Sequence, residues 1–237
     1  MGQEGEMAQT LPVPGAPGVE VILRRSARSR RLSLRVGRTD GRVTLSLPPR
    51  ASLAEARAFV DQQAQWIARH VAAAPAPRRV QVGGSLPILG QEHPIVVGTG
   101  RAARLKPDGI AVPDDDRAGP RVKALLQTLA RSHLAEAVDR YAAHLGQQPN
   151  KLTLRDTRSR WGSCSSRKDL MFSWRLVMAP KEVLDYVAAH EVAHLRHMDH
   201  SPAFWSQVAA LMPDYAPRRA WLRDQGAMLH AIDFSGA

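Results

Sequence analysis

The sequence predicts an α+β protein with an antiparallel, β-rich N-terminal part followed by a mainly helical part. Short apolar–polar alternations, interrupted by glycine, proline and one helical stretch, fill residues 19–115. Longer helical patterns follow over residues 116–230, and one of them contains His190-Glu191-Val192-Ala193-His194. We therefore expect a disordered leader at 1–18, a β-rich region at 19–115 and a catalytic domain at 116–230.

Composition indicates the compartment in which the chain is expected. Residues 1–18 have neither a basic start nor an apolar stretch, so they are not expected to be a signal peptide. No run approaches the roughly 18 apolar residues of a membrane span. Cys164 is the only cysteine, which excludes an intramolecular disulfide and favours a reducing compartment; it is expected to be a small packed residue. We expect a cytoplasmic protein that does not bind membranes.

The N-terminal strands are expected to present an arginine-rich surface. Apolar–polar alternation at 32–35 and 43–47 predicts a hairpin with its turn at Asp40-Gly41. Only Glu20 and Asp40 oppose the arginines between Val19 and Arg50, and the whole chain has a net charge of +11. These arginines are Arg24, Arg25, Arg28, Arg30, Arg31, Arg35, Arg38, Arg42 and Arg50. The surface is a candidate for binding nucleic acid or another polyanion. The alternative, a solvated charged face, is favoured, because no interleaved aromatic residues support stacking on bases.

Capping and turn signals divide the rest of the chain. Ser52 and Glu55 form a capping box that opens a helix to about Ala73, and an acidic loop follows at Pro113–Gly119. A long helix is expected from about Pro120 to Leu145, capped by Gly146. Strands are expected at Pro87–Leu89, Pro94–Val97, Ala103–Leu105, Ile110–Val112, Lys151–Arg155 and Leu170–Trp174. A loop is expected at 161–167, and further helices from Ser201 and from about Ala216 to Gln225.

The motif from His190 to His194 predicts a metal site. Residues four apart lie on one face of a helix, so both imidazoles can bind the same ion. Histidine nitrogens bind Zn²⁺ at about 2.0–2.1 Å, and two of them supply half of a tetrahedron. Glu191 lies beside them without being a ligand, in the position of a general base. The alternative is an ordinary pair of helix histidines, but four of the nine histidines lie between positions 190 and 200.

Two histidines compete for the third ligand position. Ser201-Pro202 is expected to begin the next helix, with Ser201 as N-cap and Pro202 at the first position. The chain should therefore turn near Met198–Ser201, which lets His200 fold back over the metal. His197 would still be helical, with its backbone about 10 Å from that of His190 along the axis. We favour His200, because three ligands from one straight helix do not close a tetrahedron easily.

Several segments resemble those of the YgjP-like metallopeptidases, which are small bacterial zincins related to the WLM and SprT-like groups. These segments are Arg160–Ser165, Trp174–Pro180, His190–His194, Met198–Ser201 and Phe204-Trp205. The resemblance extends over about residues 19–230 and implies a minimal zincin arrangement for 116–230, with a support helix, a short antiparallel sheet and the motif helix. It also implies that His190, His194 and His200 hold zinc and that Glu191 is catalytic. Metzincins have a similar spacing, but the glycine of their pattern is His197 here.

Other residues are candidates for supporting roles. Arg158 and Arg160 are candidates to stabilise developing oxyanion charge or to bind a carboxylate or phosphate of the substrate. The alternative is that they form ion pairs with Asp156 or Asp169. Tyr215 is expected to be partly buried, or else to donate a hydrogen bond to a tetrahedral intermediate. Asp199 is a candidate to orient a ligand histidine from behind the metal. By analogy with zincins, the Leu170–Trp174 strand is expected to be the sheet edge that pairs with an extended substrate.

These patterns favour a zinc-dependent metallopeptidase that acts on peptide or protein substrates. Zinc would polarise the scissile carbonyl, and Glu191 would take the proton from the attacking water. The alternative is a metal-dependent hydrolase of nucleotides or other phosphate compounds. A third interpretation is a basic nucleic-acid-binding module with structural zinc. The first two can be distinguished by whether the zinc-loaded protein hydrolyses peptides or nucleoside triphosphates. An open fourth coordination position on the metal would argue against the third.

Overall fold

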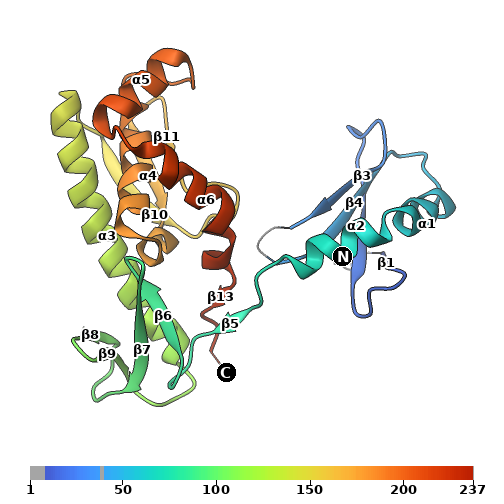
Figure 1. The fold of residues 1–237 in the computed structure, drawn as a ribbon, viewed down its shortest axis with the longest axis horizontal. Helices are drawn as coiled ribbons and strands as arrows, with labels where there is room; N and C mark the ends of the chain where they lie inside the picture. Colours follow the sequence, from blue (N-terminus) through green and yellow to red (C-terminus); the bar gives the residue numbers. More distant parts are fainter. Residues whose placement is uncertain (1–8, 38–39, 237) are drawn as a thin grey trace, which may run out of the picture. The chain divides into compact units, whose positions relative to one another are not determined.

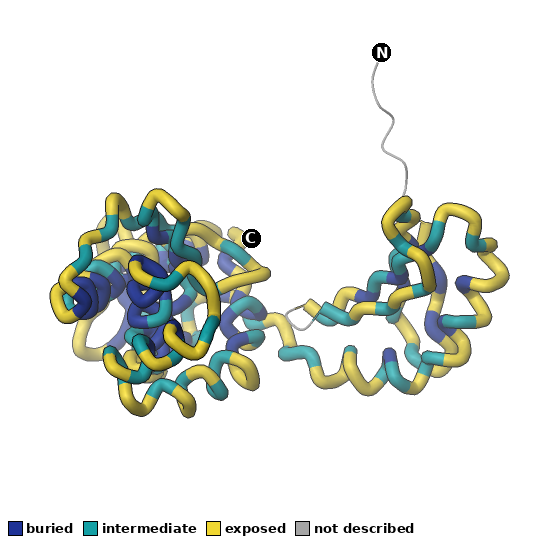
Figure 2. Tube along the Cα trace, turned by 90° about the horizontal axis from the view of Figure 1, so that it is seen from above, coloured by how far each residue is buried: buried dark blue, intermediate teal, exposed yellow. Residues whose placement is uncertain are grey.

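The computed structural model describes residues 9–37 and 40–236, and the chain divides into two compact units, Met1–Ala76 and Pro77–Ala237. Each unit has its own hydrophobic core, and the fold is α+β as expected. Figure 2 shows the buried segments inside each unit and the exposed ones around them. The division at residue 76 differs from the boundary expected at residue 115, so the segment 77–115 belongs with the helical unit.

The first unit contains a four-stranded sheet in the order β1-β2-β4-β3. Its strands are β1 (Thr10–Pro12), β2 (Glu20–Arg25), β3 (Ser33–Val36) and β4 (Val43–Leu47). Strands β3 and β4 form the expected antiparallel hairpin, with Arg35 opposite Thr44. However, β2 and β4 pair in parallel, so the sheet is mixed and not antiparallel throughout.

The expected disordered leader is wrong for the part that the structure describes. Strand β1 pairs antiparallel with β2, placing Thr10 opposite Ile22. Leu11 and Val13 are buried, with 3% and 5% exposure, and this burial favours an ordered strand. Residues 1–8 of the leader lie outside the described residues.

Two helices cover one face of this sheet. They are α1 (Leu53–Gln62) and α2 (Ala64–Ala72), which replace the single helix expected up to Ala73. The capping box is confirmed, because the Ser52 hydroxyl accepts from the Glu55 amide and the Glu55 carboxylate accepts from the Ser52 amide. Val60 and Ile67 of these helices pack with the inward-facing valines and leucines of β2 and β4.

The opposite face of the sheet is polar and carries arginines. Arg24 lies opposite Ser46, and Arg35 lies opposite Thr44, so the two arginines alternate with hydroxyl side chains on this face. Both arginines are exposed, as are Arg28, Arg30 and Arg31 in the connection from β2 to β3. We call these five residues the arginine face. Arg25 is excluded from it, because its guanidinium donates to the carbonyls of Pro49 and Ala51 at 3.0 and 2.8 Å.

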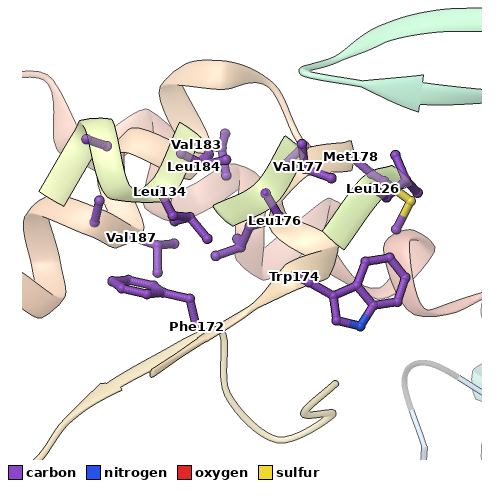
Figure 3. Close-up of a cluster of buried hydrophobic side chains, with 14 of the residues drawn as sticks. Leu126, Leu134, Phe172, Trp174, Leu176, Val177, Met178, Val183, Leu184 and Val187 are labelled. Carbon is purple, nitrogen blue, oxygen red and sulfur yellow. The ribbon is translucent and has the colours of Figure 1, made fainter. Parts of the chain in front are cut away.

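In the second unit, two helices pack side by side (Figure 1). They are α3 (Ala118–Leu145), which ends at the left-handed Gly146 as expected, and α4 (Lys181–Ala193). The 3₁₀ helix η1 (Trp174–Met178) packs against both. Figure 3 shows Leu134 of α3, Leu176 of η1 and Val187 of α4 within one apolar cluster. This cluster holds α4 in the interior of the unit.

A second sheet explains why residues 77–115 belong to this unit. Its order is β6-β7-β9-β8, and its strands are β6 (Ser85–Ile88), β7 (Gln91–Val97), β8 (Arg104–Lys106) and β9 (Gly109–Val112). The turn at Leu89-Gly90 reaches the start of α4. The Leu89 amide donates to the carbonyl of Val177 at 2.7 Å, and a Cβ on Gly90 would lie 3.0 Å from the Cα of Pro180. The hairpin therefore supports the segment that leads into α4.

The sheet next to α4 has the order β10-β12-β11, with strands β10 (Lys151–Arg155), β11 (Gly162–Cys164) and β12 (Asp169–Ser173). β12 pairs in parallel with β10 and antiparallel with β11, so this sheet is also mixed. The expectation that Leu170–Trp174 is the sheet edge is therefore wrong. This strand is central, because it buries Leu170 and Phe172 completely and has a neighbour on each side. β11, which was expected to be a loop, is an edge.

The C-terminal segment returns to the second unit. Helices α5 (Pro202–Leu211) and α6 (Tyr215–His230) precede β13 (Ile232–Asp233), which pairs in parallel with β5 (Arg78–Arg79). α6 is longer than the helix expected at Ala216–Gln225. No helix in the described ranges is both long and apolar enough to cross a membrane.

Arg175 joins three segments of the second unit. Its guanidinium, with 12% of the side chain exposed, donates to the Asp156 carboxylate at 2.7 Å. It also donates to the carbonyls of Leu229 and Ile232, at 2.8 and 3.0 Å, and stacks over the Trp174 ring. One partly buried cation thus ties the loop before β11 to the end of α6 and to β13.

Replacement of this cation tests its structural role. Arg175→Gln leaves Asp156 without its ion pair and two carbonyls without a charged donor, so it should lower the free energy of unfolding by about 2–4 kcal/mol. Urea denaturation followed by tryptophan fluorescence measures the change. Arg131→Gln, on the exposed side of α3, is the matched control and should stay within about 0.5 kcal/mol of wild type. Equal stabilities of the two variants would contradict the assignment.

Candidate active site and metal centre

Helix α4 places two histidines on one buried face. It begins after Pro180, carries Glu182 in its first turn and buries Val183 and Val187 on the side of the core. His190 and His194 follow on the same face, four residues apart. The helix ends at Ala193, one turn earlier than expected, because the amides of Leu195 and Arg196 bond to carbonyls three residues back. The expected helical position of His197 is therefore wrong.

The early turn brings the third histidine to the other two. The candidate ligand atoms of His190, His194 and His200 all lie within 4.8 Å of one another. Nε2 of His190 and Nε2 of His200 are 3.2 Å apart. Asp199 and Ser201 hold this turn, because the Asp199 carboxylate accepts from the Ser201 amide at 3.1 Å. Within the described residues, His197 does not belong to this group.

The geometry of these donors fits a tetrahedral metal ion. Two nitrogens at about 2.0–2.1 Å from one zinc lie about 3.4 Å apart, close to the 3.2 Å between His190 and His200. The Nδ1 of His194 lies 2.8 Å from the carbonyl oxygen of His197, so a proton on Nδ1 leaves Nε2 available. Burial lowers the pKa of His190 to about 3 and also lowers that of His194, which favours the neutral form that a metal requires.

Glu191 lies beside this cluster and is almost completely buried, with 5% exposure. Burial raises the pKa of its carboxyl to about 8, and the nearby Arg160 opposes this shift. Oε2 of Glu191 has no hydrogen-bond partner among the described residues. On its other side is β11, where a Cβ added to Gly162 would lie 2.5 Å from Oε1. Glycine at this position therefore leaves the carboxylate the room that it occupies.

A cavity of about 220 Å³ opens in front of Glu191. Its lining includes Arg160, Trp161, Gly162, Tyr186, His190 and Leu222. Burial raises the pKa of Tyr186 to about 12, so its phenol remains a neutral hydrogen-bond donor. The cavity thus combines a carboxylate, a cationic side chain and a phenol around the face of α4 that carries the histidines.

The two candidate arginines lie in different places. Arg160 lines the cavity, whereas Arg158 is exposed and is not among the lining residues. Within residues 9–37 and 40–236, Arg160 does not form the expected ion pair with an aspartate. Asp156 pairs with Arg175, and Asp169 lies 3.7 Å from Lys151 and from Arg167.

The other candidates support the site from outside the cavity lining. Tyr215 is half-buried and stacks between Tyr186 and Trp205, with ring centroids 6.3 and 5.5 Å away. Trp205 lies against His190, at 5.7 Å, and is covered by Arg219. The carboxylate of Asp199 is engaged with Ser201 and so acts on the turn that carries the third histidine.

Sequence reasoning missed several of these residues. Tyr186 lies four residues before His190, and the same helical spacing could have placed it on the site face. The roles of Gly162 and of the His197 carbonyl could not be predicted from the sequence. The first depends on the packing of β11 against α4, and the second depends on the backbone path of the turn after α4. Cys164 is half-buried, and burial raises its pKa to about 11, so its thiol is not poised as a nucleophile.

Comparison with known proteins adds to this geometry. A family model described as "YgjP-like, metallopeptidase domain" matches residues 30–225, a range that includes all the candidate site residues. Among solved structures, the chain is similar to the metallopeptidase zymogen of Pyrococcus abyssi abylysin. The identity is 20%, the match covers 39% of this chain and 95% of that chain, and the TM-score is 0.35. A search of curated proteins found no match.

The histidine cluster predicts which side chain completes the ligand set. His200→Ala should weaken zinc binding by at least about 100-fold, because it removes one of three nitrogens. His197→Ala should change binding little, since only the backbone carbonyl of this residue contacts the cluster. Competition with a fluorescent zinc chelator measures both affinities, and circular dichroism checks folding. A larger loss for His197→Ala than for His200→Ala would contradict this arrangement.

Proposed function

The chain belongs to the YgjP-like metallopeptidase family, and we propose that it is a zinc-dependent peptidase in which Glu191 is the general base. The observation that carries this proposal is the convergence of three histidine nitrogens beside a buried carboxylate that faces a cavity. The family supports a metal-dependent hydrolase, and the all-nitrogen donor set supports zinc as the metal.

In this proposal, His190, His194 and His200 hold the metal. When bound, zinc supplies Lewis acidity, which polarises the scissile carbonyl and makes the attacking water more acidic. Glu191 accepts the proton of that water on Oε2, which has no hydrogen-bond partner in the described part of the chain, and passes it to the leaving amine. This carboxylate is buried against β11, where Gly162 leaves room for it, because a Cβ at that position would lie 2.5 Å from Oε1.

The edge strand β11 is proposed to position the substrate. Its described hydrogen-bonded neighbour is β12, so its other edge can accept an extended peptide as a further strand. This edge begins at Gly162, which contacts Glu191, so a peptide bound there passes in front of the general base. Arg160 and Tyr186 are then available to donate to the carbonyl oxygen as negative charge develops on it.

Removal of the carboxylate charge tests the proposed base. Glu191→Gln should retain zinc and lose about 10²- to 10⁴-fold of the peptide hydrolysis, because the base is not a ligand. The measurements are zinc content and kcat on a quenched peptide library. Glu182→Gln, in the exposed first turn of α4, is the matched control and should keep full activity.

Assays of the zinc-loaded wild type and the Glu191→Gln variant also distinguish the alternative functions. Hydrolysis of nucleoside triphosphates without hydrolysis of peptides would favour a phosphate-compound hydrolase. If the wild-type protein retains zinc and hydrolyses neither peptides nor nucleoside triphosphates, a structural role for the metal is favoured. Loss of zinc from Glu191→Gln would contradict the assigned role of Glu191.

A second candidate activity concerns the first unit. The arginine face is exposed, lies on the side of the sheet opposite α1 and α2, and alternates with hydroxyl side chains. Arginine and hydroxyl groups are common donors to phosphate oxygens, so we assign this face to nucleic-acid backbone binding. This assignment is independent of the metal site.

Charge removal tests this second assignment. The double variant Arg24→Gln/Arg35→Gln should weaken nucleic-acid binding and reduce the log–log salt slope by about 1.4–1.8, or about 0.7–0.9 for each lost phosphate contact. Fluorescence anisotropy with a labelled oligonucleotide at several salt concentrations measures the slope. Arg57→Gln/Arg69→Gln, on the exposed sides of α1 and α2, is the control. Salt-independent binding, or equal loss in both variants, would contradict the assignment.

A further inference from the structure

A second concave surface lies beside the catalytic cavity, on the outer face of the β10-β12-β11 sheet. It encloses about 530 Å³. Thr153, Met171 and Ser163 lie in one row across the three strands and line it. Leu170 and Phe172 alternate with Met171 and are buried on the other face, towards the helices. We call this surface the basic groove.

The groove has a strong excess of positive charge. Four cationic side chains line it, namely Lys151, Arg155, Arg160 and Arg167, against the single carboxylate of Asp169. Asp169 lies 3.7 Å from both Lys151 and Arg167, whose side chains are 59% and 81% exposed. Among the described residues, neither Arg155 nor Arg160 has a carboxylate within ion-pair distance. The groove therefore presents several cations that its own acidic residue does not neutralise.

The groove adjoins the catalytic cavity. Arg160 lines both, and Gly162 of the cavity is followed directly along β11 by Ser163 and Cys164 of the groove. A peptide that pairs with the edge of β11 thus leaves the general base and reaches the groove within a few residues. Side chains of an extended peptide alternate between two sides, so some of them can point into the groove.

We propose that the basic groove selects substrates that carry aspartate or glutamate within a few residues of the scissile bond. The inference rests on the proposed peptidase function. Charge complementarity carries it, because carboxylates are the natural partners of arginine and lysine and the hydroxyls of Thr153 and Ser163 add neutral donors. A nucleotide fits the groove less well, because none of the residues that line it is aromatic and could stack on a base.

The test compares a neutral peptide with the same peptide carrying glutamates on one side of the cleavage site. Wild type should cleave the acidic peptide with a kcat/KM roughly 5- to 30-fold higher, mainly through a lower KM, as two or three exposed ion pairs would give. The double variant Arg155→Gln/Arg167→Gln should reduce this ratio to about one and leave the neutral peptide unaffected. The ratio for wild type should also shrink at high salt.

A matched control and a binding measurement complete the design. Arg104→Gln/Arg131→Gln removes two exposed arginines elsewhere in the same unit and should keep the wild-type ratio. Calorimetric binding of both peptides to the Glu191→Gln protein reports on the groove without catalysis. If wild type cleaves neither peptide but the Glu191→Gln protein binds the acidic peptide more tightly than the neutral one, the peptidase proposal fails. The proposal that the groove binds acidic side chains then stands.

Three results would overturn the groove assignment. One is that wild type cleaves the neutral and acidic peptides equally well and the Glu191→Gln protein binds them equally tightly. Another is a preference that survives in Arg155→Gln/Arg167→Gln. The third is displacement of the acidic peptide by a nucleoside triphosphate at far lower concentration than by a second acidic peptide, which would assign the groove to phosphate compounds.

Discussion

The candidate site depends on the burial of α4 between α3 and the β10-β12-β11 sheet. Ala188 and Ala189 are fully buried, and their small side chains let neighbouring backbone approach closely. The same helix carries His190, Glu191 and His194, so the core that packs it also fixes the spacing of the site. Because protein interiors are densely packed, α4 cannot shift without rearrangement of this core. The hairpin turn at Leu89-Gly90 supports the entry to this helix from the other side.

Sequence reasoning succeeded where local physics decides the outcome. The capping box at Ser52, the N-cap at Ser201 and the left-handed cap at Gly146 were all predicted, because each depends on residues within one helical turn. The proximity of His200 to the motif histidines was also expected from a local chain reversal before Pro202, although the helix ends at Ala193, earlier than expected.

The features that could not be predicted depend on contacts between distant segments. The parallel pairing of β2 with β4 and the central place of β12 are set by sheet assembly, which short alternating patterns do not encode. The division of the chain at residue 76 was missed for a similar reason. Residues 77–115 have the composition of the N-terminal strands, but they pack against η1 and α3. Composition thus grouped segments that the fold separates.

The hydrogen bond between His194 and the carbonyl of His197 has a consequence for how this site can vary. The acceptor is a main-chain carbonyl, so any residue at position 197 supplies it, and the hydrogen bond does not depend on the side chain at this position. The length of the loop between His194 and His200 matters instead. Inserting or deleting one residue there would move the carbonyl away from the His194 ring and leave its tautomer unfixed, although all three candidate ligand histidines would still be present. The site therefore tolerates changes of side chain at 197 but constrains the number of residues around it.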